Sequence, residues 1–167
     1  MSVSNGTLVI FDPSNTNSLA ISGIISGAGG VTQIGSGTTI LLGSNNYSGV
    51  TTVSGGVLQV GTNGTSGSIG SGSVVLGSGG NLTIYRTNAF TLTNDISGSG
   101  SLTQKGNGTT ILLGSNSYTG ATTISGGRQL GSKWLNRIRR VGRARHIAAS
   151  IYSRRLSTRA EPRTVRA

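Results

Sequence analysis

Short apolar runs separated by glycine, serine and asparagine fill the chain from its start to Gly127. The runs are rich in valine, isoleucine, leucine and threonine, which favour strands. Val57–Val60 and residues 122–125 alternate apolar and polar positions, as expected for strands with one buried face. Glycines argue against helices, since each costs about 1 kcal/mol relative to alanine in a helix interior. The pattern predicts short strands at Leu8–Phe11, Leu19–Ile25, Val31–Ile34, Thr38–Leu42, Val50–Val53, Val57–Val60, Val74–Leu76, Leu82–Tyr85, Phe90–Leu92, Leu102–Gln104, Thr109–Leu113 and Ala121–Ile124.

This strand-rich region repeats itself at a constant offset, which aligns Ile25 with Ile96. Residues 25–56 and 96–127 align without a gap and are identical at 23 of 32 positions. A long internal repeat favours a solenoid, whose coils stack at about 4.8 Å, over a sandwich or barrel. A coil of three strands and three turns takes about 20–25 residues, so one repeat predicts about three coils.

The composition of the repeats suits such a stack. Small inward side chains would fill a narrow core, and rows of Asn, Ser and Thr would satisfy one another's hydrogen bonds. Glycine at the corners would supply positive φ without steric cost. Charge is scarce in this region, which fits because like charges stacked along a sheet repel each other. The sequence therefore predicts an all-β solenoid.

The longest shared stretch carries a family resemblance. Residues 37–61 read GTTILLGSNNYSGVTTVSGGVLQVG, with a copy beginning at Gly108. This sequence resembles the autotransporter-associated β-strand repeat, whose approximate consensus is GxGTLxLxGxNxYxGxTxxxxGxLxxG. The resemblance covers most of residues 6–127. It implies a right-handed parallel β-helix in the secreted passenger of a type V secretion protein from a Gram-negative bacterium.

The resemblance also implies a function and a location. Such passengers cross the outer membrane through a C-terminal β-barrel and often act as adhesins or surface stalks. We therefore expect a cell-surface, outer-membrane or secreted location, and partners among host cells, matrix or other bacterial cells. No signal peptide or barrel is apparent in this chain, so we expect an excerpt of a longer protein. A solenoid cut at both ends exposes strand edges, which predicts self-association through those ends.

The net charge of +11 lies almost entirely after the repeats. Residues 1–127 are neutral, with Arg86 and Lys105 balancing Asp12 and Asp95. Residues 128–167 carry twelve basic residues against Glu161 alone. This shift predicts two regions, a solenoid over residues 1–127 and an arginine-rich tail over residues 128–167 that is disordered or partly helical.

Three interpretations of the tail compete. A basic amphipathic helix over roughly Lys133–Leu156 would let residues 133–166 bind nucleic acid or an anionic membrane. A helical cap would cover the last coil with Trp134 and Leu135. A frameshift near Gly127 would explain the abrupt loss of the repeat and of glycine, and would leave the tail without an evolved function.

Groups that could do chemistry are sparse. The absence of cysteine and the single histidine, His146, exclude disulfide scaffolds and zinc sites. Asp12 and Asp95 lie at opposite ends of the repeat text, so we predict no catalytic pair and expect Asp95 to serve as a turn residue or strand-end cap. Tyr47 and Tyr118 are expected to pack against neighbouring coils at a turn, with ligand stacking as the alternative. We predict no catalytic, cofactor-binding or metal-binding residue, and a protein that is not an enzyme.

Overall fold

A computed structural model of the chain describes residues 2–3, 8–12, 17–131 and 138–140. Within these ranges every regular element is a β-strand. The strands are β1 (Ser2–Val3), β2 (Leu8–Phe11), β3 (Ser18–Ile21), β4 (Ser26–Gly27), β5 (Gly30–Gln33), β6 (Thr38–Leu41), β7 (Thr51–Gly64), β8 (Val74–Arg86), β9 (Ala89–Leu92), β10 (Ile96–Gly98), β11 (Ser101–Gln104), β12 (Thr109–Leu112), β13 (Thr122–Ile124), β14 (Arg128–Gly131) and β15 (Ile138–Arg140).

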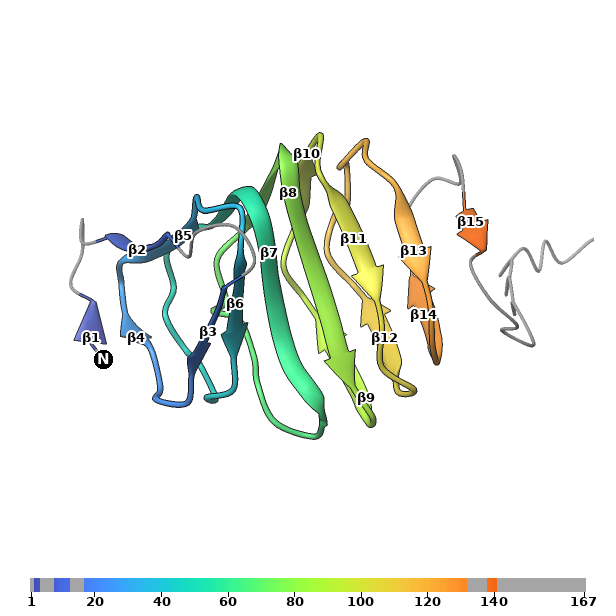
Figure 1. The fold of residues 1–167 in the computed structure, drawn as a ribbon, viewed down its shortest axis with the longest axis horizontal. Helices are drawn as coiled ribbons and strands as arrows, with labels where there is room; N and C mark the ends of the chain where they lie inside the picture. The colour runs from blue at the N-terminus through green and yellow to red at the C-terminus, as the bar shows by residue number, and fades with distance from the viewer. Residues whose placement is uncertain (1, 4–7, 13–16, 132–137, 141–167) are drawn as a thin grey trace, which may run out of the picture.

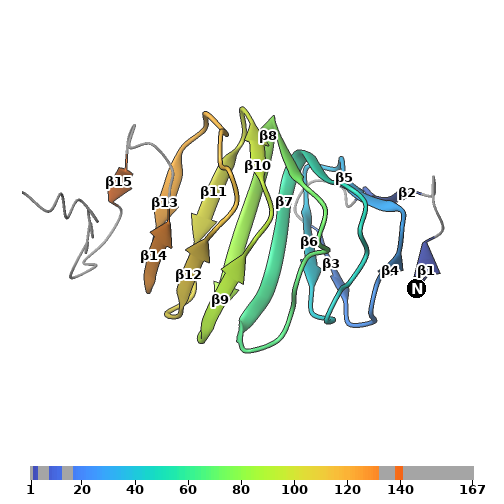
Figure 2. The same cartoon turned by 180° about the vertical axis from the view of Figure 1, so that it is seen from behind.

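The strands wind into a parallel β-solenoid of about six turns. All the strand pairs among the described residues are parallel. Figures 1 and 2 show the strands side by side across a long axis, in the order of the sequence from one end to the other. The predicted all-β solenoid is therefore confirmed.

Each coil has three faces, which we number in the order in which the chain visits them. Face 1 contains β2, β5, the first parts of β7 and β8, and β10. Face 2 contains β3, β6, the second parts of β7 and β8, β11, β13 and β15. Face 3 contains β1, β4, β9, β12 and β14. Where face 3 has no strand, backbone hydrogen bonds still join the coils, as from Ser71 N to Tyr47 O at 2.9 Å.

The register fixes the length of a coil. Along face 2, Thr38, Val57, Asn81 and Ser101 are successive ladder partners. Asn81 and Ser101, for example, are separated by 20 residues in sequence, which agrees with the predicted coil length. The coil from Val57 to Asn81 is the longest of these, because it contains the connection of residues 65–73 between β7 and β8.

Two predicted strand pairs are joined into single long strands. The predicted strands at 50–53 and 57–60 merge in β7, and those at 74–76 and 82–85 merge in β8. Both strands turn the corner between faces 1 and 2 through a glycine pair, and Gly55 and Gly56 pair with Gly79 and Gly80 of the next coil. Gly56 has a φ of 56°, and a Cβ there would clash with the Gly37 carbonyl oxygen. The glycine pair thus bends a continuous ladder where the sequence pattern predicts a break.

Inward side chains form columns that run along the axis. One column on face 2 passes through Leu19, Thr39, Leu58, Leu82, Leu102 and Thr122. All are buried except Leu19, which is 40% exposed in the first coil of this face. Burying one such leucine contributes about 1.5–3 kcal/mol, so each coil is stabilised mainly through the coils on either side.

The ends of the predicted elements differ in places from the structure. The strand predicted over Leu19–Ile25 ends at Ile21, before the corner at Gly23. The ladder also continues beyond Gly127 through β14. A helix over Lys133–Leu156 is wrong for Ile138–Arg140, which form β15 because they pair with β13. The rest of that predicted helix, including Trp134 and Leu135 of the alternative cap, lies outside the described residues.

Candidate functional site

The corner between two strands of each repeat holds a buried amide. Gln33 ends β5, and its Nε2 donates to the carbonyl oxygen of Gly35 at 2.9 Å. Its Oε1 accepts from Thr39 Oγ1 at 2.5 Å. In the second copy, Gln104 Nε2 donates to Gly106 O at 2.7 Å and its Oε1 accepts from Thr110 Oγ1. Both amides serve the fold, since a buried polar group costs free energy unless it is hydrogen-bonded.

A buried asparagine joins three successive coils. Asn45 Oδ1 accepts from Ile25 N in the preceding coil at 2.8 Å. Its Nδ2 donates to Ser68 O in the following coil at 2.7 Å. The copy, Asn116, accepts from Ile96 N at 3.2 Å and donates to Gly114 O at 2.8 Å. At these positions the side-chain amides bond to backbone groups, not to a row of Asn, Ser or Thr side chains as predicted.

The two repeat tyrosines are core residues. Tyr47 is 0% exposed and Tyr118 is 1% exposed. Each hydroxyl forms a 2.7 Å hydrogen bond, Tyr47 with Thr51 Oγ1 and Tyr118 with Thr122 Oγ1. Burial raises the pKa of both hydroxyls above the ordinary 10.0. The predicted packing against neighbouring coils is confirmed, and the rings are not exposed for ligand stacking.

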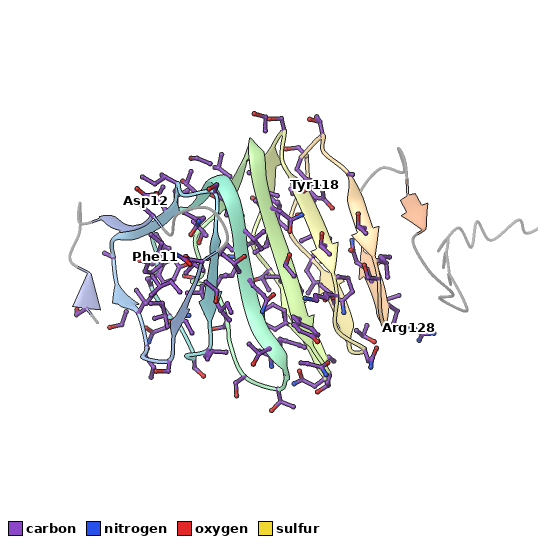
Figure 3. All side chains as sticks on the ribbon, viewed as in Figure 1. Phe11, Asp12, Tyr118 and Arg128 are labelled. Carbon is purple, nitrogen blue, oxygen red and sulfur yellow. The ribbon has the colours of Figure 1, made fainter. Side chains whose placement is uncertain are left out.

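The two carboxylates of the repeat region lie far apart. Asp12 follows β2 and Asp95 precedes β10, and both are exposed. Four coil-to-coil steps along face 1 separate these strands, or about 19 Å at about 4.8 Å per step, and Figure 3 shows Asp12 at the N-terminal end. Asp95 Oδ1 accepts from Ser115 N in the next coil at 2.6 Å, as expected for a strand-end cap. A pair of glycosidase carboxylates would need to be within about 9.5 Å.

Arg86 is a buried cation whose role the sequence did not reveal. Its guanidinium donates to the carbonyl oxygens of Gly67 and Thr65, and its Nε donates to Asn88 Oδ1 at 3.1 Å. The group also lies 4.6 Å from the centre of the Phe90 ring. Burial lowers the pKa of Arg86. Arg86 thus anchors the connection of residues 65–73; the only sequence signal was that the interval between two predicted strands is longest there.

Hydroxyl and amide side chains form a hydrogen-bonded group on the outward side of face 2. On face 2, Asn81 Nδ2 donates to Ser101 Oγ at 2.7 Å and to Thr103 Oγ1 at 3.0 Å. Thr83 Oγ1 donates to Asn81 Oδ1 at 2.6 Å. Exposed Lys105 rests its ammonium 4.6 Å from the centre of the Tyr85 ring. The hydroxyl and amide groups of face 2 thus bond to one another across two coils.

Chemistry that needs converging ionisable groups has no basis in the described part of the chain. No group of three or more His, Cys, Asp or Glu side chains capable of holding a metal was found there. His146 lies outside the described residues. None of the described segments forms a helix long and apolar enough to span a bilayer.

The two repeats are turned relative to each other by one face. Strand β5 of the first copy lies on face 1, whereas its equivalent β11 lies on face 2. Likewise β6 lies on face 2 and its equivalent β12 on face 3. Between a residue of the first copy and its equivalent in the second copy, the chain passes through ten successive faces. With three faces in each coil, this distance is three and one third turns. Equivalent surface residues of the two copies consequently point in directions that differ by one third of a turn around the axis.

Two segments of the repeat region match a known protein family. Residues 31–60 and 102–128 match the family described as the passenger-associated-transport-repeat. These two segments are thus similar to a passenger repeat, and the β-solenoid fits a passenger segment. No curated protein and no solved structure matches the chain.

Proposed function

We propose that this solenoid is a non-catalytic passenger segment that acts outside the cell as a stalk with an adhesive surface. The observation that carries the proposal is the coincidence of both family matches with coils of one continuous parallel ladder. The passenger repeat supports a surface or secreted location. The scarcity of converging ionisable groups among the described residues supports a structural or adhesive role over an enzymatic one.

The coil geometry suits a stalk. Each coil adds about 4.8 Å of length, and strands such as β5, β8 and β12 pair with strands of the coils on both sides. Asn45 adds side-chain bonds that span three coils. Stretching the axis would have to break several such bonds in each coil at once, so the solenoid resists extension.

The turned repeats suit adhesion. The outward positions of the two copies face different directions, at an axial distance of about 16 Å for three and one third coils. Partners on two sides of the solenoid can therefore contact the outward residues of one copy each, and contact through both copies strengthens binding through multivalency. The partners expected for such a surface are host cells, matrix or other bacterial cells.

Surface display tests this function. The full chain is fused behind a signal peptide and ahead of the translocation unit of a characterised autotransporter, and a matched strain displays the translocation unit alone. We expect externally added protease to reach the chain, and the displaying bacteria to clump or to bind epithelial cells and matrix-coated plates more than the matched strain does. A chain that reaches the surface without any gain in adhesion would refute the adhesive role, and retention inside the cell would refute the passenger assignment.

The same assay separates adhesion through the hydroxyl and amide side chains of the solenoid from binding through the basic residues 133–166. At about 1 M salt the Debye length falls to about 3 Å, and binding to phosphates by lysine and arginine collapses. Adhesion through hydroxyl and amide groups should persist at this salt concentration. Adhesion that disappears at high salt would favour a nucleic-acid or anionic-membrane partner instead.

A further inference from the structure

The ladder continues past the end of the second family match. In the first copy, Thr38 of β6 pairs with Val57 of β7. The equivalents of these two residues in the second copy are Thr109 of β12 and Arg128 of β14, and they pair in the same way. The backbone therefore completes the expected strand although the side chains have changed to an arginine-containing sequence.

We call the arginine-rich residues 128–167 the basic segment. A second strand of this segment, β15, joins the ladder on face 2. Ile138 pairs with Thr122 and Arg140 pairs with Ile124, so β15 lies beside β13 in parallel register. Figure 1 shows β14 and β15 at the C-terminal end of the stack. Among the described residues, β14 and β15 have a partner strand on one side only. These two strands form the C-terminal edge of the described solenoid.

The register places charge where earlier coils have none. Arg139 and Arg140 occupy the ladder positions of Thr123 and Ile124. The corresponding positions in the five preceding coils of face 2 are uncharged, and they hold Ala20 and Ile21, Ile40 and Leu41, Gln59 and Val60, Thr83 and Ile84, and Thr103 and Gln104. A further coil paired with β15 would stack against two consecutive arginine positions, and charged residues on an edge strand disfavour such pairing.

We propose that the basic segment terminates the solenoid, because its arginine-bearing edge strands prevent the end of a second copy from stacking there. A bare parallel edge is a template for pairing with another chain, and charged residues on edge strands prevent such pairing. Solenoids need terminal units that differ from the repeat in order to remain soluble. The C-terminal edge therefore rejects a second copy, in contrast to the self-association that the repeats alone predict. This inference does not depend on the adhesive function.

Substitution of the two edge arginines tests the proposal. R139T/R140I gives β15 the residues that β13 carries at the paired positions. We expect sedimentation velocity across a dilution series to show self-association at least about tenfold tighter than that of the unaltered chain. The matched control is R154T/R155I, which removes the same two charges from the basic segment outside the described ladder.

Each outcome of these experiments supports or overturns the proposal. Association of R139T/R140I alone supports edge protection by position. Equal association of both variants means that net charge rather than the edge controls the behaviour, and an unchanged R139T/R140I means that the edge does not need the arginines; both overturn the proposal. Hydrogen exchange on the unaltered full chain tests the premise without any substitution. Slowed exchange of the amides of residues 138–140 is expected, and exchange at the rate of an unstructured peptide would overturn the proposal.

Discussion

Gln129 occupies a core position that the first repeat fills with leucine. Leu58 and Gln129 are equivalent in the two copies, and they pair with the equivalent residues Thr39 and Thr110. Leu58 is fully buried. Gln129 is half-buried, and its Oε1 is the only fully buried side-chain oxygen or nitrogen in the described residues without a hydrogen-bond partner. We therefore predict that Gln129→Leu stabilises the last described coil of face 3.

The magnitude follows from three contributions. Removing an unsatisfied buried acceptor stabilises by about 1–3 kcal/mol. The leucine adds apolar contact beside Thr110, as Leu58 does beside the equivalent Thr39 in the first copy. Against this, the hydrogen bond between Gln129 and the Tyr118 hydroxyl is lost, at a cost of about 0.5–1.5 kcal/mol, while Tyr118 keeps its bond to Thr122. The expected net gain is about 1–2 kcal/mol, which corresponds to a factor of about 5–30 in an equilibrium constant.

A local measurement is required, because the end of a solenoid opens without unfolding the middle. Native-state hydrogen exchange should slow by about 5- to 30-fold at the amides of β12 and β14 in Gln129→Leu, with little change in β7. Arg128→Leu is the matched control, since it adds a leucine at the neighbouring exposed position and should leave these rates nearly unchanged. Unchanged or faster exchange in Gln129→Leu would refute the reasoning, as would equal slowing in both variants.

Three further predictions concern the middle of the stack. Gly70→Ala places a Cβ against the Tyr47 backbone oxygen and ring, and it should lower the free energy of unfolding by about 1–3 kcal/mol, as measured by urea denaturation. In the control Gly23→Ala the added Cβ meets nothing within 4 Å, so the free energy of unfolding should not change. Asn45→Ala leaves an amide and a carbonyl of the neighbouring coils unpaired and should lower the free energy of unfolding by about 2–4 kcal/mol. In the same denaturation measurement, the control Asn46→Ala removes an exposed side chain and should leave the free energy of unfolding unchanged. Burial raises the pKa of Tyr47 and Tyr118 above 10.0, so their contribution to stability is complete below pH 10.0 and declines as the pH rises through the raised values. Denaturation midpoints should therefore fall above pH 10.0, and a midpoint unchanged in strong alkali would contradict the burial of these hydroxyls.

The strand content and the stacking could be predicted from local pattern and repeat alone. Both depend on residue type and period, which a sequence displays directly. The merging of two strands into β7 could not be predicted in this way. By itself the pair Gly55 and Gly56 indicates a turn, and only the pairing with Gly79 and Gly80 of the neighbouring coil makes it part of a continuous strand. The role of Arg86 was hidden for the same reason, since the carbonyl groups that it contacts lie 19 and 21 residues earlier in the chain.

A change in composition did not predict where the ladder ends, as strand β14 shows. The shift in charge and glycine content after Gly127 predicts a change of region there, yet the backbone keeps its register through Gly131. Parallel pairing needs backbone groups and a preceding strand, and it tolerates several side-chain types at an edge. The frameshift interpretation stays a prediction, and sequencing the coding region tests it: a shifted frame should restore text like residues 60–96.

Comparison of the two copies separates the residues that build the stack from those free to change. Nine of the 32 aligned positions differ, and six of these are exposed in both copies. The six are Ala28 and Ser99, Ile34 and Lys105, Ser36 and Asn107, Asn46 and Ser117, Ser48 and Thr119, and Val50 and Ala121. The glutamine, asparagine and tyrosine that form the buried hydrogen bonds are identical in the two copies. Because these glutamine, asparagine and tyrosine side chains are already hydrogen-bonded within the fold, the proposed recognition of a partner depends on the exposed positions. Those positions differ between the copies and, through the turn of one face, point in different directions.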